Sequence, residues 1–180
     1  LADIDVMKGP MGLPPSQDRF YLNEGRARFR DASEEVGITG VERYSFQVLV
    51  LDTDLDGWLD VLVVNDVLED LLWRNEGGKR MSEISLQAGV AVRQDGVPQG
   101  GMGGAVGDYD GDLLPDLFIA NFVEDYSTLF HGLKGGFFSD VTARMGLRKD
   151  TWLMVGWGCG FVDFDADGDE ELFQINGHKI

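Results

Sequence analysis

The sequence predicts an all-β protein made of repeated four-stranded antiparallel sheets, and three observations support this fold class. The apolar runs are short and rich in Val, Leu, Ile and Phe, which favours strands over long helices. Twenty-five glycines against five prolines supply many tight turns. An acidic loop begins at Asp52, Asp108 and Asp163, and the spacings of 56 and 55 residues suit one four-stranded unit.

The first three strands of each repeat can be placed around its acidic loop. An apolar strand such as residues 46–51 precedes the loop, and a short strand ending in asparagine follows it. These following strands cover residues 61–65, 117–121 and 172–176. A third strand then runs into an Asn- or Gly-containing turn, over residues 20–25 and 72–77, with His131 and Gly132 at the equivalent place in the next repeat.

A fourth strand and one short helical turn complete each repeat. This pattern occurs at residues 29–38, 81–90 and 138–147. We expect the Ser or Thr at the start of each helical turn to cap it, and the glycine that follows to end it in a left-handed conformation. The hydroxyl residues are Ser33, Ser85 and Thr142, and the glycines are Gly37, Gly89 and Gly146.

Four strands in each unit are typical of a blade of a β-propeller. The chain holds about three and a quarter units, whereas closed propellers usually have four to eight blades. We therefore expect a segment of a larger, seven-bladed propeller. The expected division is a truncated blade over residues 1–38, blades over 39–95 and 96–150, and the start of a further blade over 151–180.

Charge and cysteine content exclude several classes of partner and cofactor. The formal net charge is −17, from 32 acidic and 15 basic residues, which disfavours nucleic acid and anionic lipid surfaces. No apolar run approaches the ~20 residues that a membrane-spanning helix needs. Cys159 is the single cysteine, so the chain can form no internal disulfide and no cysteine-based zinc or haem site.

The acidic loops have the composition of calcium sites. Each carries carboxylates at loop positions 1, 3, 5 and 9, and hard oxygen ligands at this spacing suit a cation that takes six to eight oxygens. These residues are Asp52, Asp54, Asp56 and Asp60, then Asp108, Asp110, Asp112 and Asp116, then Asp163, Asp165, Asp167 and Glu171. We expect position 7 to contribute its backbone carbonyl, which adds Trp58, Leu114 and Asp169 and gives up to three Ca²⁺ ions.

EF-hands, magnesium sites and zinc sites fit the loops less well. An EF-hand needs a glutamate at position 12, where this chain has Val63, Ile119 and Gln174. Magnesium demands a smaller octahedral site, and zinc favours His or Cys, which the loops lack. Plain Asp/Gly turns remain the alternative, although carboxylates ~4 Å apart repel by roughly 4 kcal/mol at an effective dielectric constant near 20.

Two loops depart from the pattern. The second has Gly111 at position 4 and Leu113 at position 6, where the other loops have Gly57 and Gly168. Its turn geometry must therefore differ, or Leu113 must adopt a strained conformation. The third loop has Glu171 at position 9, and the extra methylene displaces its carboxylate.

Two segments carry a family resemblance: residues 103–121 (GGAVGDYDGDLLPDLFIAN) and residues 156–178 (GWGCGFVDFDADGDEELFQINGH). They resemble FG-GAP/VCBS repeats, the calcium-loop blades related to the integrin α propeller. The pattern is most similar to bacterial secreted proteins with an ASPIC/UnbV domain, which are related to animal cartilage acidic proteins. The resemblance implies a blade fold, calcium in the hairpin loops and a role in binding or as a scaffold.

We expect a non-enzymatic, calcium-stabilised module that binds a protein, matrix or cell-surface partner. An extracellular or periplasmic location is expected, because such loops fill at the roughly 0.1–1 mM calcium outside cells. A carbohydrate-binding propeller is the alternative, with Trp58, on a loop, as the best aromatic candidate; Trp73 and Trp157, in strands, are expected to pack in the core. A calcium-dependent polysaccharide lyase fits less well. The two histidines, His131 in a turn and His178 at a strand end, lie in different repeats and form no catalytic set.

Overall fold

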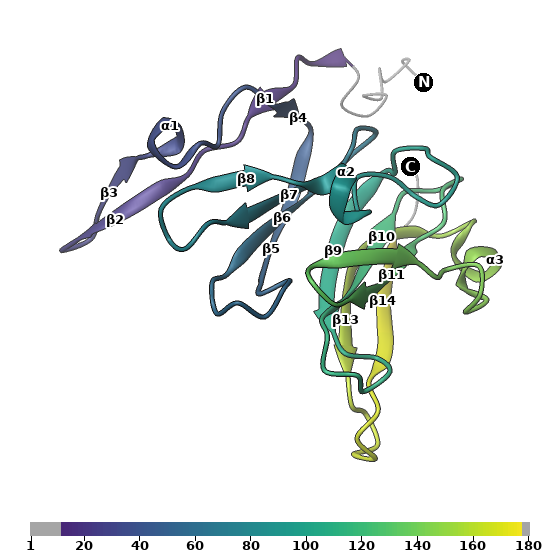
Figure 1. Ribbon diagram of the computed structural model, residues 1–180. Helices are drawn as coiled ribbons and strands as arrows, with labels where there is room; N and C mark the ends of the chain where they lie inside the picture. Colours follow the sequence, from purple (N-terminus) through teal and green to yellow (C-terminus); the bar gives the residue numbers. More distant parts are fainter. Residues whose placement is uncertain (1–11, 178–180) are drawn as a thin grey trace.

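The computed structural model describes residues 12–177, which form antiparallel sheets joined by short loops (Figure 1). Two sheets have four strands. The first contains β5 (Ser45–Leu51), β6 (Asp60–Asn65), β7 (Leu71–Asn75) and β8 (Met81–Glu83), paired in sequence order. The second contains β9 (Gly101–Gly107), β10 (Asp116–Asn121), β11 (Thr128–Leu133) and β12 (Phe137–Asp140), also paired in order. The predicted four-stranded repeat is thus confirmed for these two units, while the described residues form no closed ring.

Three further sheets have two strands each. One pairs β1 (Ser16–Gln17) with β4 (Glu42–Arg43), one pairs β2 (Tyr21–Gly25) with β3 (Arg28–Asp31), and one pairs β13 (Val155–Val162) with β14 (Glu171–Gly177). The β2–β3 hairpin and the β13–β14 hairpin lie at opposite ends of the row of sheets (Figure 1). No helix of the described residues is long and apolar enough to cross a membrane.

The repeats share one register. The strands that flank the acidic loops pair through Leu51 and Asp60, Gly107 and Asp116, and Val162 and Glu171. The outer hairpins match in the same way, through Tyr21 and Asp31, Trp73 and Glu83, and Phe130 and Asp140. Each residue of one repeat therefore has a defined structural equivalent in the others.

Successive sheets pack face to face, and their inner strands approach closely. Leu49, Leu62 and Val64 of the first sheet pack with Leu117 and Ile119 of the second. Next to this core, a Cβ at Gly104 would lie 2.8 Å from Leu49 Cδ1, and a Cβ at Gly103 would overlap the carbonyl oxygen of Trp157. Glycine at both positions is required because β9 is sandwiched between β5 and β13.

The helical turns differ from the prediction at their starts. Ser33 and Ser85 are the first residues of α1 (Ser33–Val36) and α2 (Ser85–Ala88), and neither hydroxyl caps its helix. The carboxylates of Asp31 and Glu83 accept the N–H groups of Ser33 and Ser85 instead. The hydroxyl oxygens accept the backbone N–H groups of Phe20, directly before β2, and of Leu72 in β7, which ties each helix to the third strand or the residue before it. The predicted capping role is therefore wrong, because the third strand competes for the same oxygen.

The third repeat keeps this hydrogen bond but has no helix at the predicted place. Thr142 Oγ1 accepts the N–H of Leu129, and the chain forms turns up to Gly146 before α3 (Leu147–Thr151) begins. Gly37 and Gly89 do end α1 and α2 in the left-handed conformation, as predicted.

The turn predicted at His131 and Gly132 is also wrong. Both residues lie inside β11, opposite Ser139 and Phe138, and the chain turns only after Leu133. Gly132 occupies the place of Asn75, but the left-handed glycines that reverse the chain are Gly135 and Gly136. His178 lies outside the described residues.

Candidate metal centre

Each acidic loop joins the first two strands of a sheet, so all three loops close β-hairpins as the sequence predicts. The loops lie between β5 and β6, between β9 and β10, and between β13 and β14. Because the flanking strands share one register, the nine loop positions are structurally equivalent in the three repeats.

The loop backbone has one geometry with two left-handed residues. Position 4 has positive φ in every loop, at Leu55 (φ 60), Gly111 (φ 72) and Ala166 (φ 61). Position 6 does as well, at Gly57 (φ 90), Leu113 (φ 67) and Gly168 (φ 97). Of the two alternatives for the second loop, the structure has the strained one: the geometry is unchanged and Leu113 is left-handed. Each loop therefore places one glycine and one strained non-glycine residue at these positions, a cost of roughly 1–2 kcal/mol per loop.

Side-chain hydrogen bonds hold this curled backbone. The position 1 carboxylate accepts the N–H groups of positions 5 and 6, at 3.1 and 2.8 Å for Asp52. The position 5 carboxylate accepts the N–H of position 7, at 2.8 Å from Asp56 to Trp58. The same three bonds recur from Asp108 and Asp112 in the second loop and from Asp163 and Asp167 in the third. The acidic residues therefore fix the backbone conformation of the loop as well as giving it its negative charge.

The structure brings the carboxylates of positions 1, 3 and 5 together in the first two loops. Each group offers oxygens that lie within 4.8 Å of one another. The groups are Asp52, Asp54 and Asp56, and Asp108, Asp110 and Asp112. In the third loop the corresponding group is Asp163, Asp165 and Glu171, so the longer glutamate reaches the first and third positions.

Position 9 has a different environment in the two complete sheets. Asp60 and Asp116 are buried, and each accepts a backbone N–H from loop position 2 and another from the third strand. For Asp116 these bonds are 3.0 Å from Tyr109 N and 2.7 Å from Gly132 N. For Asp60 they are 3.1 Å from Thr53 N and 2.8 Å from Asn75 N. These carboxylates therefore bind the loop to the sheet, a role that their spacing alone does not reveal.

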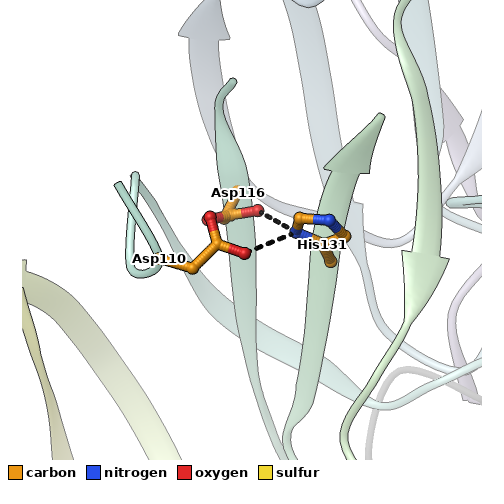
Figure 2. Close-up of side chains that lie close together, drawn as sticks. All are labelled: Asp110, Asp116 and His131. Atoms are coloured by element: carbon orange, nitrogen blue, oxygen red, sulfur yellow. Dashed lines mark hydrogen bonds and ion pairs between the residues drawn. The ribbon is translucent and has the colours of Figure 1, made fainter. Parts of the chain in front are cut away.

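A cationic or basic side chain from the third strand faces position 3. Arg74 Nε lies 3.4 Å from Asp54, and the equivalent His131 Nδ1 lies 3.4 Å from Asp110. His131 Nδ1 is also 3.2 Å from Asp116, and Figure 2 shows the ring pointing at both carboxylates. Sequence reasoning misses Arg74 and His131, which both lie on the third strand of a sheet. For His131 the reason is that the sequence pattern places it in a turn. The register of β11 is the signal that places it beside the loop.

Burial raises the pKa of one carboxylate in the first loop and of one in the second. Burial is the main cause that raises the pKa of Asp54, with Asp56 and Asp60 adding to it and Arg74 opposing it. Burial likewise raises the pKa of Asp116, against the hydrogen bonds from Gly132 and Tyr109. A divalent cation among these carboxylates would favour their charged forms.

The aromatic residues and the cysteine differ in burial. Trp73 is buried as predicted, whereas Trp157 is half exposed, so its predicted core position is wrong. Trp58 is also half exposed and covers the β7–β8 turn, where a Cβ at Gly78 would lie 2.5 Å from its ring. Cys159 is half buried among apolar side chains, and burial raises the pKa of its thiol to about 11. A neutral thiol there is a poor metal ligand.

These features define a class: repeated four-stranded sheets whose first hairpin ends in a nine-residue acidic loop. Residues 52–119, from the start of the first loop into β10, match the model of the FG-GAP-like repeat. The match supports the FG-GAP repeat family, whereas closeness to ASPIC/UnbV proteins stays a prediction. A comparison with curated proteins returned no match.

Proposed function

We propose that the chain is a calcium-binding, non-enzymatic scaffold of the β-propeller type. The observation that carries this proposal is the threefold recurrence of one strained loop that gathers three carboxylates within 4.8 Å. Backbone strain and carboxylate repulsion both disfavour the ion-free loop, and a cation that binds there offsets both.

The donor atoms favour calcium over other ions. The loops offer carboxylate oxygens, and the backbone carbonyls of Trp58, Leu114 and Asp169 are the proposed additional ligands. Hard oxygens in this number suit Ca²⁺, and the open loop tips leave room for water. In the first two loops, positions 1, 3 and 5 are the proposed direct ligands, while Asp60 and Asp116 hold the loop in place.

The proposed cellular role follows from the calcium sites and the repeat family. FG-GAP repeats generally act as interaction scaffolds, so a protein partner at the surface of the sheets is proposed. The acidity of the loops suits the high calcium concentrations outside cells, which supports an extracellular, cell-surface or periplasmic location.

Thermal unfolding in calcium and in chelator tests the proposal. An ion that binds only the folded state stabilises it by about 2.7 kcal/mol at 100 times its Kd. We expect Tm to rise with millimolar calcium and to rise much less with equal magnesium. The Asp54→Asn variant should lose part of the calcium-dependent rise, whereas Asp150→Asn, on exposed α3, should keep all of it. A Tm that does not respond to millimolar calcium would overturn the proposal.

A further inference from the structure

The second acidic loop has a mixed nitrogen and oxygen donor set that the first loop lacks. His131 Nδ1 lies 3.2 Å from Asp116 Oδ1 and 3.4 Å from Asp110 Oδ2, and ligand atoms of the three residues lie within 4.8 Å of one another (Figure 2). The loop supplies the two carboxylates, and β11 supplies the imidazole. The sequence disfavours zinc because the loops themselves contain no His or Cys, but the third strand brings a histidine to this loop.

The two imidazole–carboxylate distances fit a shared metal ion better than direct hydrogen bonds. A charge-assisted N–H···O bond is typically about 2.7–2.9 Å long, shorter than either distance. One imidazole nitrogen also carries at most one proton for the two carboxylates that face it. Ligands bound tetrahedrally at about 2.0–2.1 Å from a zinc ion lie about 3.3–3.4 Å apart. His131 Nδ1 is therefore spaced from both oxygens as the ligands of one ion are spaced.

The first repeat has a permanent positive charge where the second has the imidazole. Arg74, the equivalent of His131, lies 3.4 Å from Asp54 and is always charged. Within residues 12–177, no Arg or Lys forms an ion pair with Asp110 or Asp116. The second loop thus has the same carboxylates without the guanidinium, and the imidazole there can offer a lone pair instead.

Asp116 also has fewer hydrogen-bond donors than its equivalent in the first repeat. Asp60 accepts the hydroxyl of Thr53 in addition to two backbone N–H groups. Loop position 2 is Tyr109 in the second repeat, so Asp116 has its two backbone N–H donors and, besides them, only His131. The Asp116 side chain is fully buried, and a buried carboxylate needs a compensating positive charge. A divalent ion beside His131 supplies that charge.

Two of the three donor groups are held in place by the fold. The His131 side chain is 19% exposed, and Tyr109 packs against its ring edge-on, with the ring centroids 6.1 Å apart and the planes at 71°. The backbone N–H groups of Tyr109 and Gly132 fix the carboxylate of Asp116, and each of its oxygens keeps a further lone pair. A site built in this way needs little rearrangement when an ion binds.

We propose that Asp110, Asp116 and His131 bind one Zn²⁺ ion where the second loop meets β11. One imidazole nitrogen with two carboxylate oxygens suits zinc, whereas calcium and magnesium take oxygen ligands. Water completes the shell from the open side, because the side chain of Asp110 is 36% exposed. The ion ties the loop to the third strand, as Arg74 does in the first repeat. This site goes beyond the proposed calcium sites and does not require calcium in the loop.

Calorimetric titration of zinc into the chelator-treated full chain, in millimolar magnesium to saturate plain carboxylate sites, tests this proposal. We expect one zinc ion per chain. His131→Asn keeps a side-chain N–H donor but lacks the imidazole lone pair. It should weaken zinc binding by about 100-fold or more, since even the loss of a group that only orients a metal ligand costs roughly 10–100-fold. The matched control is His178→Asn, at the other histidine of the chain, which should bind zinc as the wild type does. Equal zinc affinity in the wild type and His131→Asn, or no saturable binding by the wild type, would rule out this site.

X-ray absorption at the zinc edge identifies the ligands in the wild-type chain and does not depend on how a variant folds. The one-to-one complex should show one imidazole nitrogen among oxygen ligands at about 2.0–2.2 Å. A shell of oxygens alone would mean that zinc binds the acidic loops without His131, and it would refute the proposal. Calcium is absent from both experiments, so zinc binding without calcium binding, or the reverse, separates this proposal from the proposed function.

Discussion

Replacing Leu113 by glycine should stabilise the ion-free protein, although the change removes a large apolar side chain. Leu113 is left-handed at φ 67, and its side chain is 80% exposed. The substitution therefore relieves backbone strain and removes little buried apolar surface. Relief of the left-handed conformation is worth roughly 1–2 kcal/mol. The greater freedom of glycine in the unfolded chain costs about 0.5–1 kcal/mol. The net effect is an increase of about 0.5–1 kcal/mol in the free energy of unfolding.

Urea unfolding in chelator measures this change. The matched control is Leu153→Gly, a leucine of similar exposure without positive φ, which should destabilise the protein by about 0.5–1 kcal/mol. Leu55→Gly, at position 4 of the first loop, should stabilise the protein in the same way as Leu113→Gly. If Leu113→Gly destabilises as much as Leu153→Gly does, the shared loop geometry is wrong.

Three further substitutions probe the packing and titration of the sheets. Gly103→Ala should destabilise by several kcal/mol or prevent folding, because its Cβ meets the Trp157 carbonyl, whereas Gly160→Ala, with open space, should not; chemical denaturation compares the two. Ser85→Ala should cost about 1–3 kcal/mol in the same assay, because it leaves the buried N–H of Leu72 without its partner, and a cost near zero would refute the tie between helix and strand. Burial raises the pKa of Asp70 from 3.8 to about 7, against hydrogen bonds from Asn65 and Gln99. Its neutral form stabilises the fold fully below pH 3.8, and this stability is lost as pH rises through about 7, by on the order of a few kcal/mol relative to Asp70→Asn. Equal pH slopes in the wild type and in Asp70→Asn would contradict this assignment.

The repeat and the hairpin loops could be predicted because they are local properties of the chain. The spacing of Asp52, Asp108 and Asp163 gives the length of the repeat directly. Carboxylates at alternate positions indicate a tightly curled loop backbone. The apolar strands beside the loops then place each loop in a hairpin. No information about distant residues is needed for these inferences.

Apart from the exposure of Trp157, the missed features of the site depend on the third strand of a sheet. Asp60 and Asp116 are buried because the third strand donates an N–H to them, and His131 faces the second loop from that strand. Ser85 binds the third strand rather than capping a helix. The second and third strands of each sheet are joined by a connection of variable length, and their register is set by tertiary packing. A single sequence does not specify this register.

The proposed function depends above all on each loop binding one calcium ion. Isothermal titration of calcium into chelator-treated protein tests this most directly. We expect saturable binding of three ions per chain, reduced to two in Asp54→Asn and unchanged in Asp150→Asn. Absence of saturable binding at millimolar calcium, or an unchanged stoichiometry in Asp54→Asn, would contradict it.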